Sequence, residues 1–434
     1  MLYQLFEWFA KNGIKFPGSG LVHFITFRVL LAVLLSLFIT MVYGKKVIKI
    51  LKKKQIGESV RELGLEGEKK KSGTPTMGGI IILLAILIPT LLLADLDKVY
   101  VILMLLCTVW LGIIGFVDDY LKIKARKISK EKGIAYKKTN ADGLAGKFKI
   151  FGQVILGIII GTTLYFNPSV VVERETVGIK TGSSYIPQRG EHQVGQDTII
   201  SNGVMHRFVT VKTPITTIPF VKTHEFNYAK LLPASWESYT YILYILIVIF
   251  IVTAVSNGAN ITDGLDGLAT GVSAIIGLGL GVFVFVSGDL RIAEYLNIMY
   301  IPNLSELSVF IAAFVGACVG FLWYNAYPAQ VFMGDTGSLA LGGIIASLAI
   351  IVRKELLIPI FCFVFLIELL SVMIQVTYFK YTKRKYGEGR RVFLMSPLHH
   401  HYQKLGYHES KISVRFWVVT ILAVVLAVVT LKLR

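Results

Sequence analysis

Residues 99–122 read VYVILMLLCTVWLGIIGFVDDYLK, an uncharged stretch that ends abruptly in two aspartates and a lysine. A helix that rises about 1.5 Å per residue needs roughly 20 apolar residues to cross about 30 Å of hydrocarbon. Val99–Val117 therefore predicts a membrane span. Asp118, Asp119 and Lys122 predict a charged boundary at one end of that span, where two adjacent carboxylates repel each other unless a cation joins them.

Apolar runs of similar length recur along the whole chain. Of the 434 residues, 54% are hydrophobic and 17% are charged, and the mean hydropathy of +0.65 excludes a soluble globule of this size. The fold class predicted is an all-α polytopic membrane protein with about ten transmembrane helices. The expected spans are 22–43, 76–95, 99–117, 150–166, 239–256, 268–287, 307–324, 338–352, 356–379 and 413–431.

The basic residues are placed asymmetrically, which predicts the orientation. Segments 45–71, 122–149 and 380–415 hold 29 of the 45 Lys and Arg residues, and all three fall on the same side of a ten-span topology. By the positive-inside rule this side faces the cytoplasm, and both termini face the opposite side. The net charge of +18 is then explained by topology and by anionic lipid, so no nucleic-acid partner is expected. The basic loops also lack the interleaved aromatic residues that stack on single strands.

Two further features bound the organisation of the chain. The three cysteines, Cys107, Cys318 and Cys362, lie inside apolar runs and predict small buried residues rather than disulfides or a zinc site, and no cleaved signal is expected. Residues 167–238 are polar and rich in Thr, Ser and Val, which predicts a small strand-rich insertion on the external, periplasmic side. The expected units are 1–166 with the first four spans, the insertion 167–238, and 239–434 with the remaining spans.

Most unusual polar residues cluster at the cytoplasmic ends of spans. Asp118 and Asp119 end the third span, and four more polar runs lie on the same face: Lys69–Gly79, Asn257–Gly267, Asn325–Ser338 and Ser396–Tyr402. Each has a simple alternative explanation, namely a solvated helix end, inside-positive lysines, a tight glycine loop, a helix cap at Asp335 or a solvated histidine run. None of these alternatives explains why all the runs gather on one face.

The residue types in these runs point to phosphoryl transfer. Aspartates offer the oxygen ligands that Mg²⁺ prefers, lysines before a helix start suit a phosphate, and histidines donate to phosphate oxygens. The chain has no Cys, His-Glu-x-x-His or spaced-His pattern for zinc. Because a water-soluble substrate pair would not need about ten spans, one substrate is expected to be a lipid.

Together, the segments Ser72–Gly79, Asp118–Lys122, Asn260–Gly267, Asn325–Ser338 and Pro397–Tyr402 resemble, in order, the phospho-N-acetylmuramoyl-pentapeptide transferase family. The resemblance covers nearly the whole chain. It implies transfer of phospho-N-acetylmuramoyl-pentapeptide from UDP-N-acetylmuramoyl-pentapeptide to undecaprenyl phosphate in the bacterial inner membrane, with UMP released and Mg²⁺ required. Roles in peptidoglycan synthesis, cell division and cell shape follow from that reaction. The oligomeric state stays open, a homodimer included.

The resemblance also implies roles for individual residues at matching positions. Asp118 matches the carboxylate that deprotonates the lipid phosphate, Asp119 its catalytic partner and Asp335 the magnesium ligand. Asp266 and His399 match residues needed for activity. The expected substrate-binding residues are Lys71, Thr76, Asn260, Asp263, Gly264, Asn325, Phe332, His400 and His401.

Several alternatives stay open at this point. Direct attack by the lipid phosphate and a two-step route through an aspartyl-phosphate need the same residue types, and direct attack is favoured because Asp118 then acts only as a base. A polyprenyl-phosphate N-acetylhexosamine-1-phosphate transferase shares the aspartate loops. A transporter is less favoured, because only Glu368 lies well inside a span and no internal repeat is visible. The 167–238 insertion is longer than the family's short external connection, and its deletion is expected to preserve activity in detergent.

Overall fold

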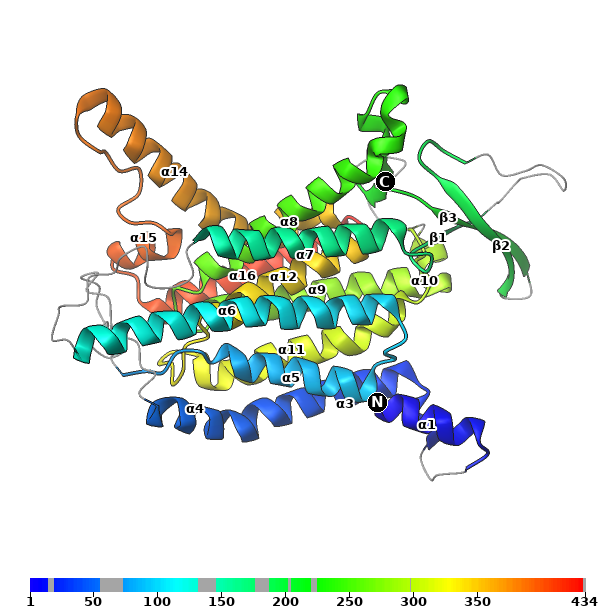
Figure 1. Ribbon diagram of the computed structural model, residues 1–434, viewed down its shortest axis with the longest axis horizontal. Helices are drawn as coiled ribbons and strands as arrows, with labels where there is room; N and C mark the ends of the chain where they lie inside the picture. The colour runs from blue at the N-terminus through cyan, green and yellow to red at the C-terminus, as the bar shows by residue number, and fades with distance from the viewer. Residues whose placement is uncertain are drawn as a thin grey trace.

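The computed structural model describes residues 1–14, 19–54, 73–131, 146–175, 187–201, 204–219, 225–296 and 298–431. Within these residues the chain is a bundle of long, roughly parallel helices with a small group of strands at one end (Figure 1). Eight helices are long and apolar enough to cross a membrane, and two shorter apolar helices, α5 and α12, lie among them. The predicted fold class, an all-α polytopic membrane protein, is confirmed.

Every expected span coincides with a helix in the described part of the chain. The bundle helices are α3 (Ile25–Phe38), which continues through the π-helical turn η1 (Ile39–Tyr43) into α4 (Gly44–Lys53), α5 (Gly79–Leu93), α6 (Val99–Glu131), α7 (Gly146–Phe166), α8 (Thr240–Thr262), α9 (Leu268–Gly288), α11 (Leu307–Asn325), α12 (Asp335–Ile351), α13 (Ile358–Phe361) with α14 (Phe363–Tyr386), and α16 (Glu409–Val429). Shorter elements are α1 (Leu2–Lys11), α2 (Ser19–Val22), α10 (Leu290–Leu296), α15 (Leu398–Lys404), η3 (Tyr228–Leu231), η4 (Ala234–Tyr239), η5 (Leu304–Glu306) and η6 (Glu355–Leu357).

Helix α12 is the central element of the core. All of its residues from Thr336 to Ile351 are buried, and it packs against α5, α6, α8 and α9. Small residues make this close packing possible, because a Cβ on Gly342 would lie 2.6 Å from the Cα of Ser256 on α8. A helix of only 17 residues can therefore sit inside the bundle, shielded from lipid by its neighbours.

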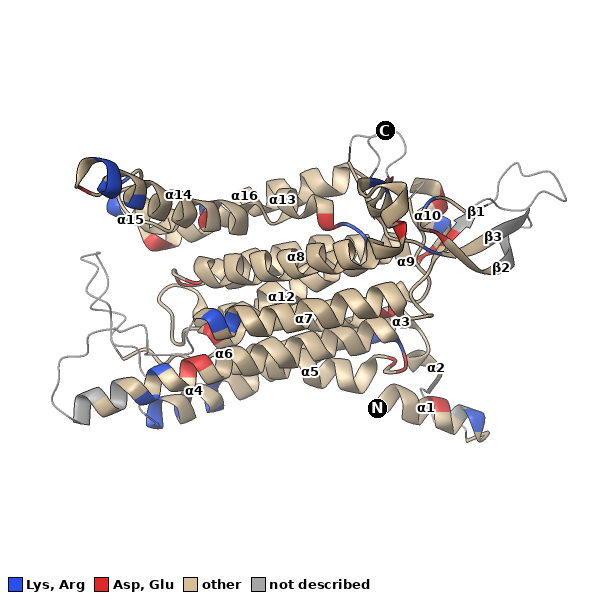
Figure 2. Ribbon diagram, turned by 45° about the horizontal axis from the view of Figure 1, so that its top comes forward, with Lys and Arg blue, Asp and Glu red and all other residues tan. Residues whose placement is uncertain are grey.

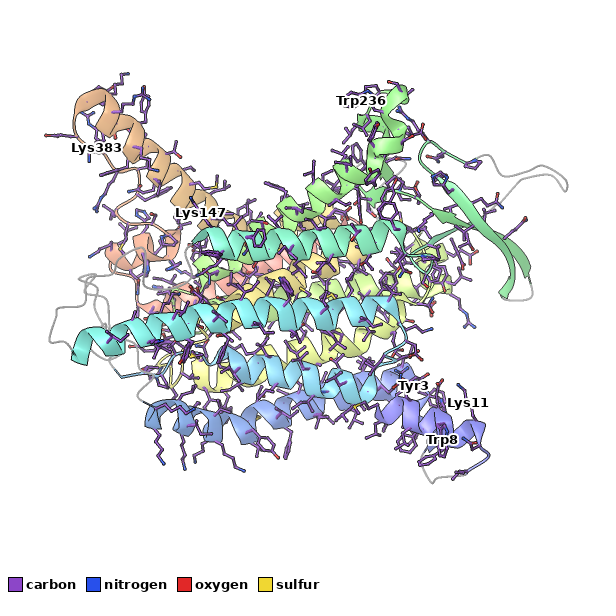
Figure 3. The ribbon with its side chains drawn as sticks, in the orientation of Figure 1. Tyr3, Trp8, Lys11, Lys147, Trp236 and Lys383 are labelled. Carbon is purple, nitrogen blue, oxygen red and sulfur yellow. The ribbon has the colours of Figure 1, made fainter. Side chains whose placement is uncertain are left out.

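The two ends of the bundle differ in chemistry. Lys and Arg gather at the end that holds α4, the start of α7, and α14 with α15 (Figure 2). Lys147 and Lys383 lie toward this end, whereas Trp8 on α1 and Trp236 on η4 lie toward the other end (Figure 3). Aromatic side chains are enriched where a protein crosses from hydrocarbon into headgroups. The arrangement agrees with a chain that places its basic loops on one side of a bilayer.

The strands fall within residues 167–238 and form two small antiparallel sheets. β1 (Val172–Glu175), β3 (Val204–Lys212) and β2 (His192–Ser201) pair in the order β1-β3-β2, and β4 (Ile215–Thr217) pairs with β5 (Glu225–Asn227). Alternating valines on β1 and β3 pack together with Met299, which follows from the two-residue repeat of a strand.

The second sheet is joined to the bundle through buried polar contacts. The Tyr228 hydroxyl donates to Glu355 Oε1 at 2.9 Å, and Lys354 Nζ donates to Thr217 Oγ1 at 2.7 Å. Burial lowers the pKa of the Lys354 ammonium to about 8, because it removes the water that stabilises the charged form. The part of the insertion around β4 and η3 therefore packs on the C-terminal end of α12.

Two local expectations need correction. The helix expected from residue 76 begins at Gly79, because Met77 has a left-handed φ of 69° and Pro75 lies in an extended segment, so this proline is not in a first helical turn. The glycine-rich run expected to form a turn from Asn257 is helical as far as Thr262, where its small residues pack closely against neighbouring helices.

The span expected over residues 356–379 is not one continuous helix. The run 356–379 is divided at Cys362 into the one-turn helix α13 and the long helix α14. Pro359 lies in the first turn of α13, where its missing N–H costs no hydrogen bond. Helix α14 then leans away from the rest of the bundle (Figure 1).

Candidate active site

Asp118 and Asp119 lie on α6 immediately after its apolar stretch and point to different partners. Successive residues of a helix are turned by about 100°, so neighbouring carboxylates cannot share one set of contacts. Both side chains are buried, at 0% and 4% exposure. Asp118 faces two lysines, whereas Asp119 faces the first turn of α12.

Asp119 caps α12 from a different helix. Its Oδ1 accepts from the backbone N–H of Asp335 at 3.1 Å, and its Oδ2 accepts from the backbone N–H and the hydroxyl of Thr336 at 2.9 and 2.7 Å. A carboxylate at this end is also favoured by the helix dipole. The residue before the helix is Gly334, whose φ of 74° suits glycine and whose Cβ would lie 2.6 Å from Asp119 Oδ2. The alternative in which the Asp335 side chain caps α12 is therefore wrong, because Asp119 fills that role.

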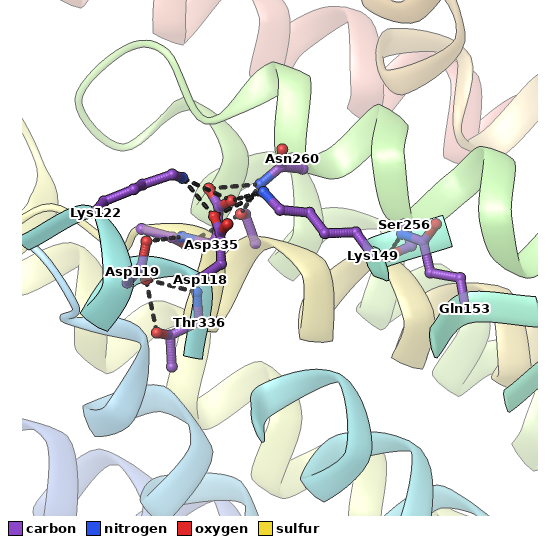
Figure 4. Close-up of polar contacts among 11 residues, drawn as sticks. Asp118, Asp119, Lys122, Lys149, Gln153, Ser256, Asn260, Asp335 and Thr336 are labelled. Atoms are coloured by element: carbon purple, nitrogen blue, oxygen red, sulfur yellow. Dashed lines mark hydrogen bonds and ion pairs between the residues drawn. The ribbon is translucent and has the colours of Figure 1, made fainter. Parts of the chain in front are cut away.

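Two lysines bridge Asp118 and Asp335 (Figure 4). Lys122 Nζ lies 2.6 Å from Asp118 Oδ2 and 2.9 Å from Asp335 Oδ2. Lys149, at the start of α7, lies 2.7 and 2.5 Å from the same two oxygens. Asn260 Nδ2 donates to the other oxygen of Asp335 at 3.0 Å. Residues from α6, α7, α8 and α12 thus meet in one network.

The carboxylate oxygens of this network suit a hard metal ion. Oxygen atoms of Asp118, Asp119 and Asp335 all lie within 4.8 Å of one another. The donor set contains only oxygen, which favours Mg²⁺ over softer metals. Three carboxylates against two ammonium groups also leave the cluster with a formal charge of −1 before any ion binds. The residues therefore fit a divalent cation that would take the oxygens now shared with the lysines.

The segment before α5 is held against the segment before α12. Phe332 N donates to the carbonyl of Pro75, and Gly78 N donates to the carbonyl of Phe332, both at 2.8 Å. This pairing places Thr76 next to Gly334, since a Cβ on Gly334 would lie 3.0 Å from Thr76 Oγ1. Thr76 and Phe332 are both half-buried at the edge of the carboxylate cluster. Lys71 lies outside the described residues.

The loop between α8 and α9 is braced by buried side chains. Asp266 Oδ2 accepts from the backbone N–H of Ala329 at 2.9 Å. Asn325 Oδ1 accepts from Gly267 N and Thr270 Oγ1, and its Nδ2 donates to the carbonyl of Val331 at 3.0 Å. In this structure Asp266 and Asn325 are thus engaged by the protein itself. Of the other loop residues expected to bind substrate, Asp263 is half-buried and Gly264 is exposed.

The three histidines point in different directions because they follow one another on α15. His399 is buried against the α8–α9 loop, where a Cβ on Gly264 would lie 2.2 Å from its Nε2. His400 Nδ1 lies 2.7 Å from Gln403 Oε1, and His401 Nδ1 accepts from the backbone N–H of Leu394 at 3.2 Å. The three imidazoles therefore make different contacts in this structure.

Sequence reasoning identifies the aspartates but misses the lysine that bridges two of them and the partner of the buried Glu368. Lys149 was counted only among basic loop residues, and nothing in its local sequence separates it from Lys147. Glu368 was noted as a carboxylate inside a span, although its partner, His399, was not foreseen. Both become visible only when helices distant in the chain are brought together.

Comparison with known proteins gives a consistent result. A signature described as phospho-N-acetylmuramoyl-pentapeptide-transferase signature 1 matches residues 71–83, and the glycosyl transferase family 4 model matches residues 197–353. Curated phospho-N-acetylmuramoyl-pentapeptide-transferases from Flavobacterium psychrophilum, Parabacteroides distasonis and Porphyromonas gingivalis are 55%, 52% and 51% identical to this chain over the full length of both proteins. The chain belongs to the phospho-N-acetylmuramoyl-pentapeptide-transferase family.

Membership in this family decides the class of the protein. It is a phosphotransferase embedded in a membrane, so the transporter alternative is excluded. The full-length matches also correct one expectation, because transferases that align over their entire length include the region of residues 167–238. The strand-rich insertion is therefore not a departure of this chain from its relatives. The carboxylate network lies beside the signature segment, because Thr76 and Asp119 both lie close to Gly334.

Proposed function

We propose that this enzyme transfers phospho-N-acetylmuramoyl-pentapeptide from UDP-N-acetylmuramoyl-pentapeptide to undecaprenyl phosphate. An oxygen of the lipid phosphate would form a new anhydride bond with the sugar-linked phosphorus, and the anhydride bond to UMP would break. The full-length relatives are phospho-N-acetylmuramoyl-pentapeptide-transferases, which supports the identity of the transferred group. The observation that carries the proposal is the network of three aspartates and two lysines at the end of the spans.

The proposed roles follow from the contacts. Asp118 takes the proton of the lipid phosphate, and Lys122 and Lys149 donate to phosphate oxygens as charge develops on them. Asp119 holds the first turn of α12, so it fixes Asp335 opposite Asp118. Asp118 and Asp335, with Asp119 beside them, would hold Mg²⁺. When bound, Mg²⁺ neutralises diphosphate charge and stabilises the leaving phosphate.

The direct route is proposed over a covalent intermediate. Asp119 is engaged by three donors from α12, which leaves it poorly placed to attack phosphorus. Asp118 then acts as the base, in addition to its place in the set that would hold Mg²⁺, and forms no covalent bond to phosphorus. Isolation of a phosphorylated Asp118 or Asp119 from enzyme incubated with the UDP donor alone would refute this route.

The enzyme is proposed to lie in the bacterial inner membrane with the carboxylate network facing the cytoplasm. The UDP-linked donor is water-soluble and the acceptor is a lipid, so the reaction must take place where a membrane meets the aqueous phase. The basic ends of α4, α7 and α14 support the cytoplasmic orientation. This location assigns the product to peptidoglycan synthesis, and through it to cell division and cell shape.

A radiolabelled-donor assay tests the proposal. Purified enzyme, undecaprenyl phosphate and Mg²⁺ are incubated with either UDP-N-acetylmuramoyl-pentapeptide or UDP-N-acetylglucosamine, and labelled lipid is extracted. The muramoyl donor alone should label the lipid, and Asp118→Asn and Asp335→Asn should each abolish the label. Preferential use of UDP-N-acetylglucosamine would indicate the related hexosamine-1-phosphate transferases instead. Unchanged turnover in both variants would refute the assignment of the site.

A further inference from the structure

Glu368 is a buried carboxylate inside the long helix α14, and the site described above does not use it. Its side chain is 0% exposed. A carboxylate in this position is costly unless it is paired and hydrogen-bonded, so its partners indicate what it does. Both of its oxygens bond to the same residue: Oε1 accepts from the backbone N–H of His399 at 3.2 Å, and Oε2 lies 3.0 Å from His399 Nδ1.

This arrangement fixes the orientation and the tautomer of the imidazole. A carboxylate only accepts hydrogen bonds, and Oε1 already accepts from the backbone N–H of His399. Nδ1 must then carry the proton that it shares with Oε2. The second ring nitrogen, Nε2, is left as the acceptor of a neutral imidazole.

Nε2 has no hydrogen-bond partner among the described residues, although it is fully buried. It points at the α8–α9 loop and touches Gly264, where a Cβ would lie only 2.2 Å away. That loop carries Asp263 and Asp266. A buried ring nitrogen without a partner is costly, and it is explained if a substrate group supplies the missing contact.

We propose that Glu368 is a positioning residue that aims His399 Nε2 at the substrate. This inference rests on the proposed function. The carboxylate holds the proton on Nδ1 and presents Nε2 toward the loop, as an acceptor when the ring is neutral and as a donor to a phosphate oxygen when it is protonated. In the protonated state the charge of Glu368 balances the imidazolium. Glu368 touches no reacting atom and acts only through His399.

Glu368→Gln is the informative substitution, because a carboxamide has one acceptor and one donor end. If its oxygen keeps the backbone N–H of His399, its NH₂ group faces Nδ1 and forces the ring into the opposite tautomer, with the proton on Nε2. The side chain keeps its shape while the ring presents the wrong atom to the loop.

Gln375, two turns along α14, provides a matched control. Its Oε1 accepts from the backbone N–H groups of Val392 and Phe393 at 3.1 and 3.0 Å, so it also ties α14 to the segment before α15. It makes no contact with His399 in the described structure. Gln375→Ala therefore reports the effect of loosening this segment without altering the imidazole.

Two measurements on the full-length enzyme test the proposal. Imidazole ¹⁵N spectra, with the His399 signal assigned by its absence in His399→Gln, should show the proton on Nδ1 in the wild type and on Nε2 in Glu368→Gln. Turnover should fall by about 10- to 100-fold in kcat with KM within about threefold, as for other residues that orient a functional imidazole. Gln375→Ala should stay within about threefold of the wild type.

A double variant separates positioning from a general structural effect. Adding Glu368→Gln to His399→Gln should reduce turnover no further, since both changes remove the same function. A wild-type tautomer in Glu368→Gln, an equal loss in Gln375→Ala, or additive losses in the double variant would each overturn the proposal. The spectra do not depend on turnover, so a wild type that fails to use the muramoyl donor would refute the proposed function while leaving the tautomer result to stand or fall separately.

Discussion

Lys149→Met is expected to tighten metal binding and slow turnover at the same time. Lys149 Nζ lies 2.7 Å from Asp118 Oδ2 and 2.5 Å from Asp335 Oδ2, the oxygens that a bridging cation would need. The lysine therefore competes with a divalent cation and repels it. Methionine has a similar length and no charge, so it removes the competitor without leaving a large gap.

The size of both effects follows from the contacts. A hydrogen bond to a charged group contributes about 1.5–3 kcal/mol net, and the Lys149 side chain is only 17% exposed, so solvent weakens its ion pairs little. If metal binding must break one such contact, removing the lysine strengthens binding by about 10- to 100-fold. If Lys149 donates to a phosphate oxygen in the transition state, the same energy is lost from catalysis, and kcat falls by about 10- to 100-fold.

Mn²⁺ binding in detergent, followed by electron paramagnetic resonance without substrates, measures the first effect, and the radiolabelled-donor assay measures the second. Lys147→Met is the matched control, because Lys147 is exposed, lies two residues away and carries the same charge. It should change neither quantity by more than about twofold. Weaker Mn²⁺ binding in Lys149→Met would refute the competition, and unchanged kcat would refute the role in phosphate binding.

Three other outcomes are expected. Thr336→Val removes the hydrogen bond from the hydroxyl to Asp119 and should lower the free energy of unfolding by about 1.5–3 kcal/mol. Thr336→Ser keeps the hydroxyl and should retain most of that stability. Equal falls in thermal midpoint for the two variants would contradict this expectation. Between pH 8 and 10 the unfolded chain binds a proton at Lys354 that the folded chain has released. The stability of the wild type should therefore rise with pH by more than that of Lys354→Met. The same dependence of thermal midpoint on pH in both proteins would exclude this contribution. Removing residues 197–208, the outer part of the β2–β3 hairpin, should leave turnover within about twofold. Removing residues 167–238 should instead unfold the enzyme, because it takes away the hydrogen-bond partner of Lys354. If the shorter deletion gives a folded protein that has lost turnover, the hairpin has a role in catalysis.

The last of these predictions revises an expectation drawn from sequence. Composition alone suggests that the whole external insertion is dispensable, because it is polar and lies away from the aspartates. The contacts of Tyr228 with Glu355 and of Lys354 with Thr217 show that its second half covers buried charges at the C-terminal end of α12. Burial of a charge depends on the partner that covers it, and composition carries no information about that partner.

The sequence predicted the spans and the gathering of polar segments, because both depend on local patterns. A run of apolar residues must cross the membrane, and a polar residue beside it must lie at a boundary. Roles within the site were less accessible. Asp118 and Asp119 are neighbours in sequence, yet one meets lysines and the other caps α12, and only the angle between successive helical residues and the position of α12 separate them.

The errors in helix boundaries share a physical cause with the geometry of the site. Gly79 begins α5 where a Cβ would lie 2.2 Å from Gly337 N, and Gly115 lies where a Cβ would be 2.2 Å from the carbonyl oxygen of Asp335. Sequence alone leaves ligand contact and close helix packing open for the pair that contains Gly79, and the structure shows that Gly79 and Gly115 let α5 and α6 approach the first turn of α12. Any larger residue would push that turn away from Asp118 and Asp119. The distance between the carboxylates is thus set by residues that carry no functional group.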